Sequence, residues 1–376
     1  MSLETLQVLK DLIDAPSPSG FEQPAQAVFL RAVEPFSDET HTDVMGNAYA
    51  IVNPGGSPKV MLAGHCDEIG FLITHINGEG YLYFQGVGGH DANIVVGQRV
   101  IVHTQGGPLL GVIGKKPIHH MEEDERRRGT VLHDLFIDIG ATGKAAVAGK
   151  VTIGDPVTFA PGFQTVEGNL AVSHAFDNKV GAFAVAEAIR LLKGKTLSAA
   201  VYGVSTVQEE IGLRGARTSS YFTEATVGIA IDVGFATDYP GMSKNRHGEI
   251  ELGKGPIITR GANINPQVHK MLREIAEELG IPYQQHAASG GTGTDANAMQ
   301  LNQAGMATGL VGIPLRYMHT PCEMVSLDDV ENTARLVAAF IERVGPDTDF
   351  TPTMQNLHSG IPPVAKPDRK NDDQRS

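Results

Sequence analysis

Acidic and imidazole side chains of this chain gather directly after apolar runs, where a sheet can present polar groups to a ligand. The clearest case is the apolar run 199–207, which is followed by two acids, Glu209 and Glu210, and then by Gly212. Two neighbouring carboxylates raise each other's pKa unless a positive charge lies between them. A lysine, an arginine or a metal ion would supply that charge.

Four further candidate ligands lie after predicted strands or at junctions of a loop and a helix, namely His65, Asp177, Asp232 and His319. In open α/β sheets the carboxyl ends of the strands form one crevice, so residues far apart in sequence meet there. Two imidazoles and several carboxylates favour Zn, Co or Mn over a thiolate site. If one carboxylate bridges, the set divides into two ions about 3.5–4 Å apart, an arrangement typical of hydrolases.

Each of these residues also has a structural interpretation. Asp177 stands before a predicted helix and could be its N-cap, and Asp232 could cap a turn after a strand. Glu209 and Glu210 could form a solvated corner. A single histidine after a strand is more often hydrogen-bonded to its neighbours than bound to a metal. The pattern predicts a metal site and leaves these alternatives open.

Helices and buried strands alternate along two parts of the chain, which is typical of an α/β domain. The predicted helices cover residues 3–13, 24–32, 178–189, 266–279 and 327–344. The predicted strands cover residues 47–52, 59–64, 199–207, 226–231 and 306–313. These elements place the candidate ligands at strand ends and at the start of a helix.

The segment between these two parts has a different pattern. From about 70 to 163, short β-like runs, one of them at 94–103, alternate with glycine and proline turns, which indicates an inserted β-rich domain. Its charged stretch 122–128 is expected to be a solvated loop. We therefore expect a discontinuous catalytic domain of residues 1–68 and 165–350, with an inserted domain of residues 69–164. The polar, proline-containing tail 351–376 is expected to be disordered.

Composition restricts the partners and the location. The formal net charge of −13 argues against nucleic acid and anionic membranes as partners. No run approaches the roughly 20 apolar residues of a membrane-spanning helix, and the first residues lack the pattern of a signal peptide. Cys66 and Cys322 are too few for a disulfide framework. A cytoplasmic protein is expected.

Five motifs together resemble the glutamyl aminopeptidase/TET aminopeptidase family, metallopeptidase family forty-two. They are His65-Cys-Asp67-Glu68-Ile-Gly70, Phe176-Asp177-Asn178, Gln208-Glu209-Glu210-Ile-Gly212-Leu-Arg-Gly215-Ala216, Ile231-Asp232 and Arg316-Tyr317-Met-His319-Thr. The resemblance covers essentially residues 1–350, in the family's order. It implies a three-layer α/β catalytic domain with a mixed central sheet, and an inserted small PDZ-like β domain that helps to form dimers.

The resemblance also implies a set of metal ligands. His65 and Asp232 would bind one divalent ion, Glu210 and His319 would bind the other, and Asp177 would bridge both. Zn is the expected metal, with Co and Mn as alternatives.

Three further implications concern the surroundings of the metals. Glu209 would be the general base, and Asp67 would accept a hydrogen bond that orients His65. The bond between Asp177 and Asn178 is expected to be cis, as is common in the family. Because Glu209 and Glu210 are neighbours with different roles, their side chains should point in opposite directions, as an extended strand end would allow.

The implied function is a dinuclear-metal aminopeptidase that acts on peptides with a free N-terminus. A metal-bridging hydroxide would attack the scissile carbonyl, and Glu209 would pass a proton to the leaving amine. The family typically assembles into tetrahedral dodecamers, and smaller oligomers also occur, so a homo-oligomer is expected.

Three alternatives stay open. A carboxypeptidase or deacylase could use the same scaffold. A glycosidase could use Glu209 and Asp232 as its acid and nucleophile, which would leave both histidines without a role. A scaffold without enzymatic activity would place at least one of the six site residues too far away to share a metal site.

Four features have no assigned role. The loop 289–295 carries an extra Thr-Gly relative to the simpler Gly-Gly-Thr-Asp pattern, so Thr292 and Asp295 are equally consistent with a structural loop. His90 follows two glycines and either reaches the substrate pocket or forms a structural turn. Cys66 and Cys322 flank ligand motifs and are expected to be small buried hydrophobes.

Overall fold

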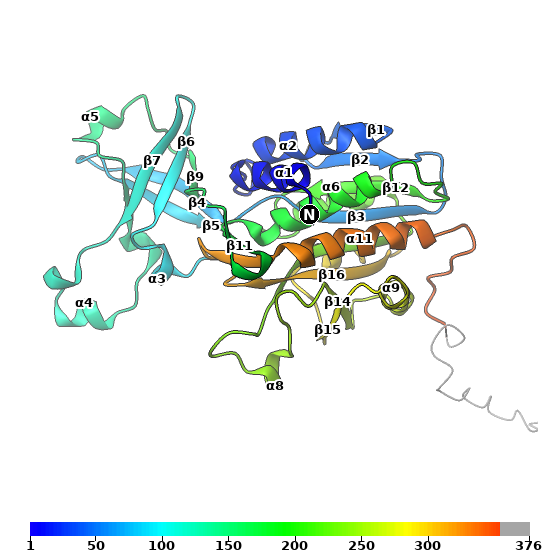
Figure 1. Ribbon diagram of the computed structural model, residues 1–376. Helices are drawn as coiled ribbons and strands as arrows, with labels where there is room; N and C mark the ends of the chain where they lie inside the picture. The colour runs from blue at the N-terminus through cyan, green and yellow to red at the C-terminus, as the bar shows by residue number, and fades with distance from the viewer. Residues whose placement is uncertain (354–376) are drawn as a thin grey trace, which may run out of the picture.

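The computed structural model describes residues 1–353 and shows an α/β domain beside a closed β-barrel (Figure 1). From residue 354 on, the tail that the sequence predicts to be disordered lies outside the described residues. Within residues 1–353, none of the helices combines the length and apolar character needed to cross a bilayer. The cytoplasmic location stays a prediction.

A mixed sheet forms the centre of the α/β domain. In order across the sheet its strands are β1 (Glu39–Thr42), β2 (Ala48–Val52), β12 (Ala200–Thr206), β3 (Lys59–His65), β13 (Val227–Phe235), β16 (Ala307–Arg316), β17 (Glu323–Ser326), β11 (Leu170–Ser173) and β10 (Gln164–Val166). Strand β14 (Ile257–Gly261) pairs with β16 and with β15 (Gln284–Ala288). Strands β12, β3, β13 and β16 are parallel, so their carboxyl ends share one edge.

Helices cover both faces of this sheet, which confirms the predicted three layers. One face packs against α1 (Leu3–Asp14), α2 (Gln23–Val33), α6 (Phe176–Leu191), α9 (Pro266–Leu279) and α11 (Leu327–Arg343). The other face packs against α7 (Arg214–Thr223) and α10 (Ala296–Met299). Successive side chains of β3 point to opposite faces of the sheet, so this strand contributes to both cores. Val60 and Leu62 belong to the first core, and Met61 and Ala63 belong to the second.

The inserted segment forms a closed antiparallel barrel with its own core. Around the barrel the strands are β4 (Gly70–Ile76), β5 (Leu82–Val87), β8 (Phe136–Asp138), β7 (Gly107–Gly114), β6 (Arg99–Thr104) and β9 (Pro156–Phe159). Phe71, Phe84 and Phe159 meet edge to face inside it. The expected β-rich insertion is confirmed. The exact division of the chain into domains and the dimerisation role stay predictions.

Two local predictions in the barrel segment were wrong. The apolar stretch 94–103 is not one strand, because α3 (Ala92–Val95) occupies its start, where Asp91 accepts the N–H of Asn93 as an N-cap. The stretch 122–128 is not simply a loop, because a capping box between Glu122 and Glu125 starts the short helix α4 (Glu123–Arg127). Its residues are exposed, as expected.

The remaining short helices connect these elements. They are α5 (Lys144–Val147), α8 (Lys244–His247), η1 (Glu34–Phe36), η2 (Ile118–His120), η3 (Leu132–Asp134) and η4 (Glu167–Asn169). Helix α8 belongs to a long connection between β13 and β14 that projects from the sheet (Figure 1).

Helix α6 approaches strands β3 and β13 closely through two glycines. A Cβ atom on Gly64 would lie 2.5 Å from the carbonyl carbon of Gly181, and one on Gly181 would lie 2.6 Å from the carbonyl oxygen of Ile231. Gly64 immediately precedes His65, and Gly181 lies one turn after Asp177. The missing side chains therefore allow these two polar residues to meet.

We predict that Gly64→Ala lowers the free energy of unfolding by about 1–3 kcal/mol, the usual effect of overpacking a core. The matched control is Gly162→Ala, because no atom lies within 4 Å of the added methyl group. It should change stability by less than about 0.5 kcal/mol. Denaturant titration of both variants measures the difference, and equal stabilities would contradict the proposed close approach.

Candidate metal centre

A cleft of about 840 Å³ opens at the carboxyl edge of the parallel strands. The residues that line this cleft include all six expected in the metal centre: His65, Asp177, Glu209, Glu210, Asp232 and His319. The parallel register places the end of β3 beside the end of β12, and β13 beside β16. The topology thus brings together residues that are up to 254 positions apart in sequence (319 − 65).

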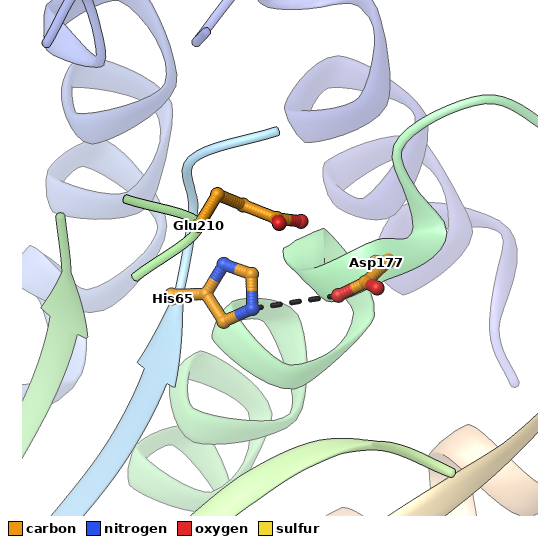
Figure 2. Close-up of side chains that lie close together, drawn as sticks. All are labelled: His65, Asp177 and Glu210. Carbon is orange, nitrogen blue, oxygen red and sulfur yellow. Dashed lines mark ion pairs between the residues drawn. The ribbon is translucent and has the colours of Figure 1, made fainter. Parts of the chain in front are cut away.

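His65 lies at the end of β3 and faces three carboxylates. Its Nε2 atom is 3.4 Å from Oδ1 of Asp177, 3.7 Å from Oδ1 of Asp232 and 3.8 Å from Oε2 of Glu209. Figure 2 shows the imidazole pointing toward Asp177. His65, Glu209 and Asp232 form one buried group that could hold a metal ion, with ligand atoms within 4.8 Å of one another.

Asp177 faces a different histidine with each carboxylate oxygen. Oδ1 is turned toward His65, whereas Oδ2 is 3.3 Å from Nε2 of His319. The same Nε2 atom is 3.3 Å from Oε1 of Glu210, and this oxygen is buried without a hydrogen-bond partner. A second group that could hold a metal ion consists of His65, Asp177 and Glu210 (Figure 2).

Asp67 organises both His65 and the two adjacent glutamates. The Nδ1 atom of His65 is 3.0 Å from the backbone oxygen of Asp67 and 3.4 Å from its Oδ1. Because a carbonyl can only accept, Nδ1 donates this hydrogen bond, and Nε2 is the ring nitrogen that faces the carboxylates of the cleft. The carboxylate of Asp67 accepts the backbone N–H groups of Glu209 (2.9 Å) and Glu210 (3.1 Å).

Glu209 and Glu210 lie in a turn, so the expected extended strand end was wrong. Strand β12 stops at Thr206, and Gln208 has a φ of 56°. The carbonyl of Glu209 then accepts the N–H groups of Gly212 and Leu213, both at 2.9 Å. The turn still separates the two side chains, because Glu209 faces His65 and Glu210 faces His319.

The structural alternatives for Asp177 and Asp232 are also wrong. Oδ1 of Asn178, and not Asp177, accepts the N–H of Gly181 at the start of the regular helix. Asp232 lies inside β13 and not in a turn after it. The bond between Asp177 and Asn178 is cis, which confirms the expectation from the resemblance.

Glu323 is a functional candidate that the sequence reasoning missed. One of its oxygens accepts the N–H of Asp177 at 3.0 Å, and the other accepts the N–H of His319 at 2.8 Å. His319 has a φ of 60°, a conformation that a non-glycine residue adopts only when its surroundings hold it there. The only sequence signal was an acid four residues after His319, at the start of a short strand.

The electrostatics of the cluster suit cations. Burial, with Asp232 nearby, raises the pKa of Glu209 to about 10, and burial also raises the pKa of Glu210 and of Asp232. Although burial opposes the imidazolium form, the neighbouring carboxylates of Asp177 and Glu210 raise the pKa of His319 to about 11. Protons therefore balance the excess of carboxylates, and divalent cations could replace them.

Three of the residues without an assigned role, namely His90, Cys66 and Asp295, make structural contacts. The Nε2 atom of His90 bonds to the carbonyl of Gly70 at 2.7 Å and its ring stacks on Phe71, so His90 stabilises the barrel. Cys66 packs in a small apolar cluster, which confirms the prediction, whereas Cys322 is exposed. In the loop 289–295, Oδ2 of Asp295 accepts the hydroxyl of Thr206 at 2.6 Å.

Known proteins resemble this chain over nearly its full length. Lysyl aminopeptidase of Pyrococcus furiosus is 37% identical over 92% of this chain and 99% of its own. The crystal structure of a TET aminopeptidase from a marine sediment Thaumarchaeota archaeon is 36% identical, with a TM-score of 0.87 over 91% of this chain and 97% of that one.

A further solved structure is informative about assembly. The Pyrococcus horikoshii TET1 peptidase, which can assemble into a tetrahedron or a large octahedral shell, is 30% identical, with a TM-score of 0.81 over 90% of this chain and all of that one. The family model of the M42 glutamyl aminopeptidases matches residues 46–336. The chain therefore belongs to the M42 glutamyl aminopeptidase family and is a hydrolase of the aminopeptidase class.

Proposed function

We propose that the chain is a dinuclear-metal aminopeptidase that removes N-terminal residues from peptides. The observation that carries this proposal is the orientation of Asp177, which turns one oxygen to His65 and the other to His319. A carboxylate between two histidine–acid pairs suits a bridging ligand. The number of ions and their identity belong to the proposal, with Zn expected first and Co or Mn as alternatives.

His65 and Asp232 would hold one ion together with Oδ1 of Asp177. His319 and Glu210 would hold the other together with Oδ2 of Asp177. Two such ions lower the pKa of a water molecule and polarise the scissile carbonyl. Asp67 and Glu323 fix these ligands through the backbone N–H groups on which they depend.

Glu209 would be the general base and acid. Its backbone N–H is held by Asp67 at 2.9 Å, and its carboxylate lies 3.8 Å from His65, at the edge of the cluster. Glu209 would take a proton from the attacking water and deliver it to the leaving amine. The carboxylates of this cluster would attract the free α-amine of the substrate, which suits action on N-terminal residues.

We expect a chelator to abolish hydrolysis of amino-acyl chromogenic substrates, because the acids and histidines alone cannot activate water. Zn, Co or Mn should restore the activity. N-acetylated versions of the same substrates should not be cleaved. Full activity after verified metal removal would contradict the metallopeptidase proposal. Cleavage of blocked substrates alone would favour the carboxypeptidase or deacylase alternative.

Two isosteric substitutions separate the base from the ligands. Glu209→Gln should keep both ions and lower kcat by about 10²–10⁴-fold, the usual contribution of acid–base catalysis. Asp232→Asn should instead reduce the metal content measured by elemental analysis. Because Glu209 also lies within reach of a metal held by His65 and Asp232, loss of metal in Glu209→Gln would show that Glu209 is a ligand.

We also propose that the chain forms a homo-oligomer, with a tetrahedral dodecamer as the expected assembly. The support is the assembly of the related TET1 peptidase into closed shells. Light scattering coupled to size exclusion should give a mass close to twelve chains of 40.0 kDa. A monomer at micromolar concentration would contradict the proposal.

A further inference from the structure

The turn that carries Glu209 is held by side chains from distant parts of the chain. Four successive backbone N–H groups, those of residues 207–210, each donate to a side-chain oxygen. In order along the turn, the acceptors are Oδ1 of Asn47 at 3.2 Å, Oε1 of Glu22 at 3.2 Å, Oδ1 of Asp67 at 2.9 Å and Oδ2 of Asp67 at 3.1 Å. The direction of the Glu209 side chain therefore depends on these contacts as well as on the strand that precedes the turn.

Gln208 is the residue of this turn whose backbone most needs to be held. Within residues 207–210, only Gln208 has a positive φ, at 56°. A non-glycine residue keeps this left-handed conformation only where its surroundings fix it. Its carbonyl accepts the N–H of Arg214 at 3.2 Å, and its own N–H donates to Glu22 at 3.2 Å. Because Gln208 directly precedes Glu209, a change in this backbone would turn the carboxylate of Glu209 away from His65.

Glu22 is a buried carboxyl group that the adjacent helix does not use. It stands at the N-cap position of α2, yet its side chain makes no capping hydrogen bond, and only 3% of the residue is exposed. Oε1 instead accepts the N–H of Gly20 at 2.7 Å and the N–H of Gln208. Burial raises the pKa of Glu22 to about 7. An apolar side chain would avoid this cost of burial, so packing alone does not account for a glutamate here.

We propose that Glu22 is a positioning residue, which holds the N–H of Gln208 and so fixes the side chain of Glu209 in the orientation needed for proton transfer. This inference rests on the proposed role of Glu209 as the general base. Glu22 is not among the residues that line the cleft, so it acts through the turn and not on the substrate. Asp67 holds the N–H of Glu210, so loss of Glu22 should leave that ligand in place.

The test varies the acceptor at position 22 in the metal-loaded full-length protein, with the amino-acyl chromogenic substrate that the wild type cleaves fastest. Glu22→Met keeps the length of the side chain but removes the carboxyl acceptor. It should lower kcat about 10–100-fold, the usual effect of a misplaced catalytic group. Its KM, and its metal content by elemental analysis, should stay unchanged. Glu34→Met is the control, because it removes an exposed carboxylate directly after the same helix and should leave kcat unchanged.

Two conservative variants separate the hydrogen bond from the charge. Glu22→Gln keeps an accepting oxygen at the same distance along the side chain and should retain kcat close to that of the wild type. Glu22→Asp keeps the charge but withdraws the oxygen by one methylene group, so it should lower kcat as Glu22→Met does. Glu22→Asp also tests the contact if Glu22→Met does not fold.

A double-mutant cycle shows whether Glu22 acts through Glu209. In the Glu209→Gln background, Glu22→Met should lower kcat no further, because the group that it positions has been removed. Equal losses in both backgrounds would overturn the inference, and so would wild-type kcat in both Glu22→Met and Glu22→Asp. Loss of metal in Glu22→Met, or an equal loss of kcat in Glu22→Gln, would also overturn it. A wild-type protein without aminopeptidase activity would instead overturn the proposed function itself.

Discussion

The carboxylate of Asp177 is the interaction around which the site is arranged, because its two oxygens face two imidazoles from opposite parts of the chain. His65 comes from the end of β3, and His319 comes from the turn after β16. Bringing this many acids together in a buried place is unfavourable unless positive charge is present. Burial, and after it the neighbouring acids, raise the pKa of Glu209, and two cations would supply the missing positive charge.

The surrounding fold holds the site residues in place largely through hydrogen bonds to their backbone N–H groups. Asp67 and Glu323 each accept two backbone N–H groups from site residues, so each fixes two functional side chains at once. Gly64 lets β3 come close to α6, and Gly181 lets α6 come close to β13, so that His65 and Asp177 can meet. Changes at these positions would move the ligands without removing any of them.

Much of the fold followed from the sequence, because apolar periodicity reports burial directly. The helices and parallel strands that carry the site were predicted within a few residues, and His65 was correctly placed at a strand end. The turn at Glu209 depended on the left-handed backbone of Gln208, which no local pattern indicates. Glu323 was missed because its role consists of two contacts, one of them 146 residues away. His90 was undecided because only the closed barrel supplies its partners.

The central claim is that Asp177 bridges two metal ions, and anomalous diffraction from zinc-loaded crystals tests it most directly. Two anomalous peaks per chain are expected, about 3.5–4 Å apart. One should contact His65 and Asp232, the other should contact Glu210 and His319, and Asp177 should contact both. A single peak, or a pair in which Glu209 replaces one of these ligands, would contradict the claim.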